Sequence, residues 1–468
     1  MQKIIIKQFG AVKDAEIEIN KVLVLIGEQA SGKSTIAKLI YFFKSLRDEL
    51  FDHIYQDNSK DHFDTLSDLI LPIQEKFYDF FGSTYHLPYF EIIYYYSIEN
   101  NMFLKLSLTE NKKLHAIFSD KFLSGAFKNK ASDMKKLLQK TTQSDSIHEQ
   151  IAYEQNKYKN IQKLSSFVNE AFCSFQTTSL FIIAGRNATV SYSELFGKYL
   201  FANIQSKIED NKLQTFKKKE QTVDESLMLS FIERVSKIKN LFEKYGNFEG
   251  LIEFYLNDTT EKERFKKIKD KMDDILKGKY SIDRWGEKII IDEKTGQYVH
   301  LHNSSSGQQE VVRILQDLFL ILIEKQKALR IIEEPEAHLF PIAQKSIIEL
   351  LAFFINQDNE IIITTHSPYV LTVFNNLLFA NRVVEKNPNS EDEVNAIIEK
   401  SIRLKQPDFS AYSLTGQNAA DDPTVFCENI VSNKTGLINQ NYLDTVSEML
   451  SSDFDRLYSI HSKSLIRK

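Results

Sequence analysis

The stretch VLVLIGEQASGKST, Val22–Thr35, joins an apolar run to a glycine-containing loop and to the start of a helix-like pattern. Its first residues are apolar and often β-branched, which is typical of a strand buried on both faces. The loop fits the pattern G-x4-G-K-[ST], and the residues from Lys33 to about Leu46 predict a helix. A strand, a glycine loop and a helix in this order predict an α/β fold with a phosphate-binding loop (P-loop).

The residue types in this loop suit a nucleoside triphosphate. Gly27 and Gly32 allow the backbone to wrap closely around phosphates, and the N–H groups of the loop favour negative charge. Lys33 would reach the β- and γ-phosphates of ATP, and Ser34 would hold Mg²⁺. The other predicted ATP-binding residues lie in the same segment: Gln29, Ala30, Ser31 and Thr35. A chance match occurs in about one or two chains in a hundred of this length, so nucleotide binding is favoured over a plain glycine-rich turn.

Two carboxylates follow a second apolar run in LRIIEEPEAHLFP, Leu329–Pro341. In a Walker B element, Glu333 would contact Mg²⁺ through water, and Glu334 would orient or deprotonate the attacking water. Adjacent carboxylates repel one another, so a cation would give them a reason to lie together. The alternative is a charged surface turn, which accounts better for Glu336 than for the acidic pair.

A third apolar run ends in IIITTHSP, Ile361–Pro368, where His366 could hydrogen-bond the γ-phosphate. A single histidine is more often structural, but this one follows the third strand of a series. Ligands of open α/β sheets bind at the carboxyl ends of the strands. We therefore expect the P-loop, the acidic pair and His366 to meet at one edge of a sheet, with Glu334 and His366 as the catalytic residues.

Length and composition narrow the class of protein. The 468 residues are enough for two or three units. A formal net charge of -5 argues against a protein that coats nucleic acid through bulk charge. Two cysteines provide neither a disulfide framework nor a zinc site. Apolar runs stay shorter than the ~18 residues of a membrane span, so a soluble cytoplasmic protein is expected.

Changes in sequence texture divide the chain into four predicted parts. They are an N-terminal lobe with the P-loop (1–108), a mainly helical insertion with a core strand near 179–187 (109–279), a C-terminal lobe with the acidic pair and His366 (280–400), and a helical tail (401–468). The insertion carries nearly balanced charge, which favours a solvated helical arm. A surface that faces DNA is the alternative there, with six candidate lysines: Lys217, Lys218, Lys219, Lys266, Lys267 and Lys269.

Together these motifs resemble the ABC-type ATPase heads of the SMC, RecF and OLD families, and bacterial AAA-family ATPases of types 15 and 21. The segment SSSGQQE, Ser304–Glu310, is similar to the signature loop written LSGGQ. Ser305 falls at the signature serine, Gly307 at the second glycine and Gln308 at the glutamine. Ser304 stands where leucine is usual, and Ser306 where the first glycine is usual.

The resemblance also assigns roles to Arg186 and His338, and the sequence departs from the family pattern at Glu333. FIIAGRN is similar to the PAGR-type strand of the group, which implies that Arg186 faces the nucleotide or the partner head. His338 falls in the region that resembles the D-loop. Glu333 replaces the usual Walker B aspartate and is one methylene longer. The implied fold is an α/β P-loop NTPase, an ABC-type ATPase head, split by a mainly helical insertion and followed by a helical C-terminal tail.

In such heads, the signature loop closes on the γ-phosphate that a second head holds. The resemblance therefore implies a head-to-tail homodimer, or a higher homo-oligomer, that closes on ATP and Mg²⁺ and opens after hydrolysis. The type 15 and 21 resemblance extends to ATPase subunits of Septu- and PARIS-like anti-phage systems, in which a separate nuclease would be the effector. DNA or RNA is a possible further partner, and a membrane is not expected.

Two alternatives stay open. A RecF-like DNA-repair ATPase would bind DNA ends or gaps in an ATP-dependent way. A structural scaffold would bind ATP and scarcely hydrolyse it. Stimulation of hydrolysis by DNA would favour an anti-phage ATPase that binds DNA, or a DNA-repair ATPase, over the scaffold.

Overall fold

The structure is a computed structural model. It describes residues 1–56, 67–121, 147–174, 178–191, 223–415 and 426–439, together with the single residues Asn129, Asp133, Ser452 and Phe454. Lys217, Lys218 and Lys219, which the sequence suggested as DNA-facing candidates, lie outside the described residues.

A six-stranded sheet forms the centre of the molecule, in the order β14-β13-β3-β12-β11-β7. Five neighbouring strands run parallel, and β14 pairs antiparallel with β13 at the edge. The strands are β3 (Val22–Gly27), β7 (Thr178–Ile182), β11 (Ala328–Glu333), β12 (Glu360–Thr365), β13 (Phe409–Leu414) and β14 (Cys427–Asn429). The three apolar runs predicted to end at one edge of a sheet, β3, β12 and β11, are immediate neighbours.

The central strands are buried on both faces, as the apolar run of β3 predicts. Val22 and Val24 contribute to one hydrophobic core, and Leu23 and Leu25 contribute to the other. Successive side chains of a strand point to opposite faces, so a continuous apolar run supplies two cores at once. The sheet therefore separates two packed layers.

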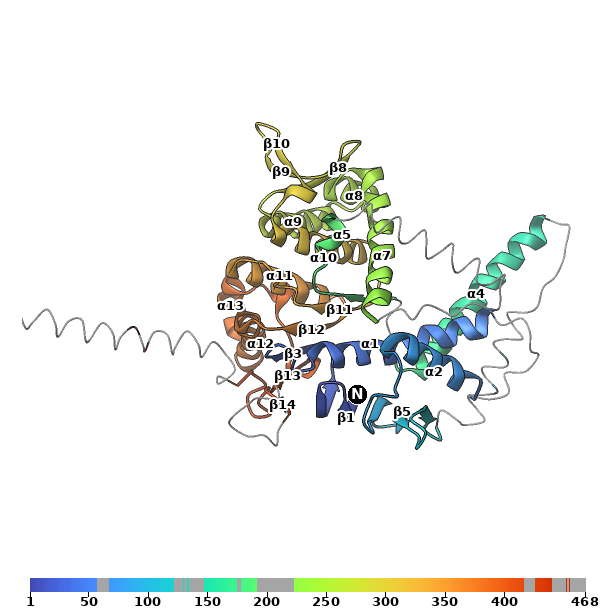
Figure 1. The fold of residues 1–468 in the computed structure, drawn as a ribbon. Coiled ribbons are helices and arrows are strands. Elements are labelled where there is room, and N and C mark those ends of the chain that lie inside the picture. Colours follow the sequence, from blue (N-terminus) through green and yellow to red (C-terminus); the bar gives the residue numbers. More distant parts are fainter. Residues whose placement is uncertain are drawn as a thin grey trace, which may run out of the picture.

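An antiparallel sheet and three helices make up the layer on one face. The five strands have the order β2-β1-β4-β5-β6. They are β1 (Gln2–Phe9), β2 (Val12–Ile19), β4 (Glu91–Ser97), β5 (Met102–Leu108) and β6 (Leu114–Phe118). Helix α1 (Lys33–Gln56) packs against α2 (Ser67–Phe81) and α4 (Ile147–Ala171) in this layer (Figure 1).

Strand β6 lies inside the range 109–279, which the sequence assigned to a mainly helical insertion. Its residues Leu114, Ala116 and Phe118 are buried, whereas His115 and Ile117 between them are exposed. This period of two is the mark of a half-buried strand, and β6 pairs with β5. The antiparallel sheet thus continues past the predicted boundary at 108.

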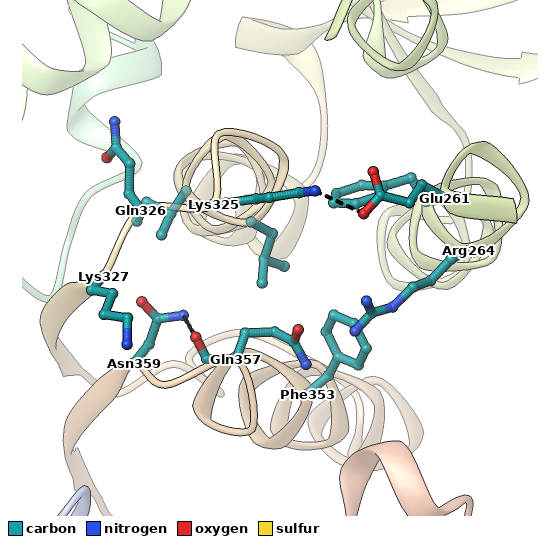
Figure 2. A pocket seen from close by; sticks show the side chains of 11 residues that line it. Glu261, Arg264, Lys325, Gln326, Lys327, Phe353, Gln357 and Asn359 are labelled. Carbon is teal, nitrogen blue, oxygen red and sulfur yellow. Dashed lines mark hydrogen bonds and ion pairs between the residues drawn. The ribbon is translucent and has the colours of Figure 1, made fainter. Parts of the chain in front are cut away.

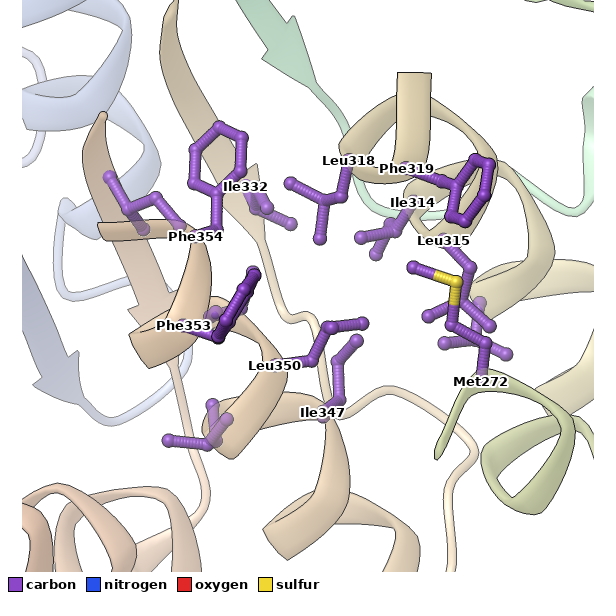
Figure 3. Close-up of a cluster of buried hydrophobic side chains, with 14 of the residues drawn as sticks. Met272, Ile314, Leu315, Leu318, Phe319, Ile332, Ile347, Leu350, Phe353 and Phe354 are labelled. Atoms are coloured by element: carbon purple, nitrogen blue, oxygen red, sulfur yellow. The ribbon is translucent and has the colours of Figure 1, made fainter. Parts of the chain in front are cut away.

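Helices cover the other face of the central sheet. They include α7 (Val223–Tyr245), α8 (Phe248–Tyr255), α9 (Thr259–Leu276), α10 (Ser306–Ile323), α11 (Pro341–Ile355) and α12 (Pro368–Lys386). Figure 3 shows side chains of α9, α10 and α11 gathered in the core on this face, with Ile332 of β11 near Phe354 and Leu318. None of the helices in the described ranges combines the length and the apolar content that a membrane crossing requires.

Smaller elements complete the chain. A three-stranded antiparallel sheet consists of β8 (Lys279–Asp283), β9 (Gly286–Asp292) and β10 (Gln297–His300), and it leads directly into the loop before α10. Helices α5 (Ala188–Ser191) and α13 (Glu391–Ile397) are short. In Figure 1 the three-stranded sheet lies at the end of the molecule farthest from β1.

The range 401–468, predicted as a helical tail, contains two strands that the sequence analysis missed. Strand β13 pairs in parallel with β3, so it lies directly beside the P-loop strand. In its sequence FSAYSL, the small or polar residues Ser410, Ala411 and Ser413 interrupt the large apolar ones, so no continuous apolar run marks the buried strand. Ser452 and Phe454, farther along this range, are helical.

Candidate functional site

The carboxyl ends of four parallel strands share one edge of the central sheet, called here the nucleotide edge. The P-loop follows β3, the acidic pair lies at the end of β11, His366 follows β12, and Gly185 and Arg186 follow β7. Parallel pairing of these strands places their carboxyl ends side by side. The convergence predicted from three separate stretches of sequence is confirmed by this arrangement.

The two P-loop glycines are required by their surroundings. Gly27 has φ +155°, and a Cβ atom there would lie 2.2 Å from the carbonyl oxygen of Leu414 in β13. Gly32 has φ +95°, and its Cβ would lie 2.9 Å from Cγ2 of Val12. Both backbone conformations favour glycine. The loop is thus pressed against β13 on one side and β2 on the other, which fixes its curvature.

Lys33 turns back into the P-loop. Its Nζ donates hydrogen bonds to the carbonyl oxygens of Gly27 at 2.8 Å and Glu28 at 2.6 Å. Burial lowers the pKa of this amine, whereas the charges of Glu334, Glu28 and Glu336 raise it. The ammonium group therefore lies in the loop, within electrostatic reach of the carboxylates at the end of β11.

The rest of the loop presents a surface that suits phosphates. Ser34, Gln29 and Ala30 are exposed, Thr35 is half-buried, and Ser31 is buried. Helix α1 begins at Lys33, so its N-terminal N–H groups are directed toward the loop.

Glu333 and Glu334 are adjacent but lie in different surroundings. Glu333 is buried; its Oε2 accepts a hydrogen bond from the Ala184 N–H at 3.1 Å. Its Oε1 is buried without a hydrogen-bond partner among the described residues. A buried carboxylate oxygen without a partner is costly, and a cation held by Glu333 and Ser34 would remove that cost. The residues present therefore fit Mg²⁺.

Glu334 projects from a strained turn. Its φ is +45°, a left-handed conformation that is uncommon outside glycine. Its N–H donates to the carbonyl oxygen of Thr364 in β12 at 2.9 Å. Its Oε1 lies 3.2 Å from Nε2 of His366. The two residues predicted to be catalytic are thus in direct contact at the nucleotide edge.

Glu336 does not fit the alternative of a charged surface turn. Only 7% of the residue is exposed. Its Oε1 accepts hydrogen bonds from the hydroxyl of Thr365 and from the N–H of His366, the latter at 3.3 Å. Burial raises the pKa of this carboxyl group, and the Thr365 hydrogen bond opposes that rise. Glu336 therefore links the end of β11 to the residue that precedes His366, which the sequence could not reveal because Thr365 lies 29 positions away.

The signature-like loop forms the start of α10. Ser305 is the N-cap residue; its hydroxyl accepts from the Gln308 N–H, and the Gln308 side chain accepts from the Ser305 N–H at 3.0 Å. This reciprocal pair is a capping box. Gln308 also donates to the carbonyl oxygen of Leu276 at 2.7 Å, which ties the loop to α9. Ser304 donates its hydroxyl to the Leu301 carbonyl oxygen.

Within this loop, buried and exposed residues have different roles. Ser305 and Ser306 are exposed, while Gly307 is buried. A Cβ atom at Gly307 would lie 2.6 Å from the carbonyl oxygen of His338, so only glycine fits there. His338 itself is exposed and has φ +59°. The loop therefore rests on the D-loop-like turn and directs two serines outward.

The loop and the P-loop helix belong to opposite faces of the sheet. Helix α10 packs in the core that contains Val24 and Ile363, whereas α1 packs in the core that contains Leu25 and Ile362. Figure 1 likewise places α10 beside α9 and away from α1.

Arg186 corrects another expectation. The sequence resemblance placed it toward the nucleotide or a partner head, but its exposed fraction is 0%. Its guanidinium donates to carbonyl oxygens of Ile183, Glu310, Glu333 and Glu334 at 2.8 to 3.1 Å. Burial lowers the pKa of this group, and Glu310 is the foremost of the charges that raise it. Arg186 thus acts inside its own chain.

The lysines suggested as DNA contacts divide in the structure. Lys269 is buried and pairs with Glu249 at 2.9 Å and with Asp270 and Asp273 at 3.3 Å. Since its charge is satisfied internally, the prediction of a DNA-facing Lys269 is wrong. Lys266 and Lys267 are exposed.

A pocket of about 290 Å³ lies at the opposite edge of the sheet, where β11 and β12 begin. Figure 2 shows Glu261 and Arg264 of α9 facing Lys325, Phe353 and other side chains across it. None of the predicted ATP-binding or catalytic residues lines this pocket. This pocket therefore lies apart from the predicted nucleotide site.

Comparisons with known proteins agree with the motifs. The model of a protein family described as AAA ATPase domain, type 15 of the AAA group, matches residues 1–371. The matched range includes the P-loop, Arg186, the signature-like loop, the acidic pair and His366. None of the curated proteins matches this sequence.

Solved structures of SMC heads are similar to the chain. An SMC head bound to the C-winged helix domain of ScpA has 12% identity and a TM-score of 0.34, over 79% of this chain and 90% of that chain. The SMC head domain from Thermotoga maritima has 11% identity and a TM-score of 0.32, over 79% and 90%. An SMC head with an extended coiled coil, bound to the C-terminal domain of ScpA and derived from Pyrococcus furiosus, has 14% identity and a TM-score of 0.31, over 80% and 92%.

The family match covers most of the chain and includes every motif at the nucleotide edge. The chain therefore belongs to the AAA ATPase domain family.

Proposed function

We propose that the protein hydrolyses ATP and that ATP joins two copies head to tail, so that the dimer acts as a switch. In this proposal, the P-loop N–H groups and Lys33 bind the β- and γ-phosphates. Ser34 and Glu333 hold Mg²⁺, which would neutralise phosphate charge when bound. This assignment is supported by the fit of Gly27, Gly32 and Glu333 described above.

The acid–base chemistry is assigned to the contact between Glu334 and His366. Glu334 would orient a water molecule and accept its proton as the water oxygen attacks the γ-phosphorus and the bond to the bridging oxygen breaks. His366 would hydrogen-bond the γ-phosphate, and its 3.2 Å contact with Glu334 would keep both groups aligned. Proximity of the two side chains before substrate binds reduces the ordering needed in the transition state.

One observation carries the dimer proposal: the exposed serines and the P-loop belong to opposite layers of one chain. Ser305 and Ser306 project from the N-terminus of α10, where N–H groups favour an anion. The P-loop helix packs on the other face of the sheet. A second copy, turned head to tail, would bring its serines to the phosphate held by the first.

The proposed biological setting is an anti-phage defence system with a separate nuclease effector. Its support is the similarity of SSSGQQE and EEPEAHLFP to the defence ATPases, which concerns motifs of the ATPase head. In that setting, closing of the dimer would change the surface offered to the effector. Turnover that DNA accelerates, without any effect on a nuclease, would instead favour a DNA-repair ATPase.

The solution mass of Glu334→Gln tests the dimer, because this variant should bind ATP and hydrolyse it slowly. We expect light scattering to show a rise from monomer to dimer when ATP and Mg²⁺ are added. Adding Ser305→Arg should abolish the rise while leaving ATP affinity within about 3-fold of its parent, since this side chain would block the trans contact. Thr260→Arg adds the same charge at an exposed position at the start of α9 and serves as the control.

A mass that ignores ATP would overturn the dimer proposal. A constant larger assembly would direct attention to a scaffold, the outcome expected of an ATP-binding protein with little turnover. Retained ATP-dependent association in the Ser305→Arg variant would show that the signature-like loop is not the trans contact.

A further inference from the structure

Arg186 connects two parts of the ATPase that the sequence keeps far apart. Its Nη1 donates to the carbonyl oxygen of Glu333 at 2.8 Å, and its Nη2 donates to that of Glu334 at 2.9 Å. Its Nε donates to the carbonyl oxygen of Glu310 at 3.0 Å and lies 3.2 Å from the Glu310 carboxylate. One fully buried guanidinium therefore bonds the end of β11 and the first turns of α10.

The bond to Glu334 holds a conformation that is unfavourable by itself. Glu334 has φ +45°, and non-glycine residues keep such a backbone only when their surroundings impose it. The Glu334 N–H is held by Thr364 on one side, and its carbonyl oxygen is held by Arg186 on the other. Both peptide groups of the residue are thus fixed, and with them the direction in which its carboxylate leaves the strand.

The bond to Glu310 reaches the signature-like loop. Glu310 lies in α10, which begins directly after Ser305, and only 1% of Glu310 is exposed. Any shift of this rigid helix along its axis would move the Glu310 carbonyl and carboxylate against the guanidinium. The signature-like loop and the proposed general base of the same chain are therefore two ends of one hydrogen-bonded connection.

We infer that Arg186 is a positioning residue: it fixes the backbone of Glu334 for catalysis and joins it to the signature helix α10. This inference rests on the proposed function. It adds that contact between the Ser305 loop and a neighbouring nucleotide would act on the Glu334 of the loop's own chain. In a head-to-tail dimer, each chain would then adjust its own active site according to the nucleotide held by its partner.

The chemistry of arginine explains why this residue type is needed. The planar guanidinium offers five N–H donors in fixed directions, enough to bond β11 and α10 together. A lysine at this position would offer three donors from a single atom, so it could not satisfy both groups. Arg186→Lys keeps the positive charge beside Glu310 and removes the geometry.

A second buried arginine on α10 provides a matched control. Arg313 donates to the carboxylate of Glu287 in β9 at 2.6 and 2.8 Å, and 1% of Arg313 is exposed. This pair joins α10 to the three-stranded sheet and has no bond to β11 in the described structure. Glu287→Gln therefore weakens a buried arginine–glutamate pair that holds the same helix to β9, without touching Glu334.

The experiment compares Arg186→Lys, Glu310→Gln, their double variant and Glu287→Gln in the full chain. Each is measured for thermal unfolding, for the Kd of a fluorescent ATP analogue, and for kcat and KM. We expect Arg186→Lys to lower kcat about 100-fold and Glu310→Gln about 10-fold, with the ATP Kd within about 3-fold of wild type. The double variant should be no slower than Arg186→Lys, because both changes break one connection. Glu287→Gln should lower the melting temperature and keep kcat within about 3-fold.

Several outcomes would overturn the inference. Wild-type kcat in Arg186→Lys would remove the positioning role. Parallel losses of ATP binding and kcat would indicate a purely structural residue, and multiplied effects in the double variant would separate Arg186 from Glu310. If Arg186→Lys fails to fold, Glu310→Gln, which keeps the side-chain shape, provides the test. A lower kcat with an unchanged ATP Kd in that variant supports the positioning role, and an unchanged kcat contradicts it. A wild-type protein without hydrolysis would instead refute the proposed function.

Discussion

The two edges of the central sheet differ in how their charged groups are paired. At the edge where β11 and β12 begin, Lys325 pairs with Glu261 at 2.8 Å, and Lys21 pairs with Asp358 at 3.1 Å. The Asn359 side chain bonds backbone groups through both of its polar atoms. At the nucleotide edge, one oxygen each of Glu333 and Glu336 is buried without a hydrogen-bond partner among the described residues. Two unpaired buried carboxylate oxygens thus lie where the motifs meet, whereas the charged pairs of the opposite edge are satisfied.

Backbone strain also differs in meaning between the edges. Lys325 and Asp358 have φ +53° and +63°, but both follow helices, where a left-handed residue is an ordinary helix ending. Glu334 has φ +45° directly after strand β11, where no helix ending accounts for the left-handed conformation. The pocket of about 290 Å³ lies at the edge whose charges are satisfied. At the nucleotide edge, unpaired buried carboxylate oxygens and a left-handed residue that ends no helix therefore occur together.

The comparison predicts the largest effect for Lys33→Ala. Lys33 supplies the only side-chain ammonium group in the P-loop segment 27–35, so its removal leaves the phosphates without that charge. We expect the Kd for ATP, measured with a fluorescent analogue, to rise more than about 100-fold. Lys325→Ala removes an ammonium from the opposite edge and should leave the Kd unchanged. Equal ATP affinity in both variants would remove the P-loop assignment.

Glu336 comes next, because it contacts the proposed catalytic pair through Thr365 and the backbone of His366. Glu336→Ala removes the acceptor of both hydrogen bonds and should lower kcat about 10- to 30-fold, with ATP affinity retained. Glu336→Gln keeps an acceptor oxygen and should recover most of the rate. If Gln and Ala are equally slow at saturating ATP, the acceptor role of Glu336 is wrong.

Gly307→Ala should have a smaller effect that falls on association. Its Cβ would lie 2.6 Å from the His338 carbonyl oxygen, so the start of α10 or the D-loop-like turn must shift. We expect the free energy of unfolding to fall by about 1–3 kcal/mol, and the ATP-dependent dimer of Glu334→Gln to weaken when this change is added. Ser306→Ala, at the exposed neighbouring position, is the stability control. Unchanged association in Gly307→Ala would show that the dimer tolerates movement of the loop.

The strands and loops of the nucleotide edge could be predicted because their signals are local. β3, β11 and β12 are apolar runs that end in polar motifs, and parallel packing then brings those ends together. β13 was missed since FSAYSL has no continuous apolar run, although it lies beside β3. It is buried because α12 and β3 pack against it. Both elements are distant in the sequence, so the local residue pattern does not reveal this burial.

The internal roles of two charged residues show where such prediction stops. A core strand near 179–187 was predicted and β7 lies there, but the partners of Arg186, Glu310 and Glu334, lie 124 and 148 positions away from it. The alternative of a charged surface turn accounted better for Glu336 than for the acidic pair, yet Glu336 is buried. Burial of a charged residue depends on hydrogen bonds formed across strands, so its sequence neighbours do not reveal it.

The smallest effect is expected at the opposite edge, for Glu261→Gln. This change removes the ion pair with Lys325, whose side chain is 66% exposed. Solvent screens such pairs, so the free energy of unfolding should change by less than about 1 kcal/mol. ATPase kcat and ATP-dependent mass should match wild type, because water can solvate the exposed Lys325 ammonium once its partner is neutral. A loss of activity comparable to that of Glu336→Ala would mean that the two edges are coupled, and satisfied charge could then no longer be taken as the sign of a structural edge.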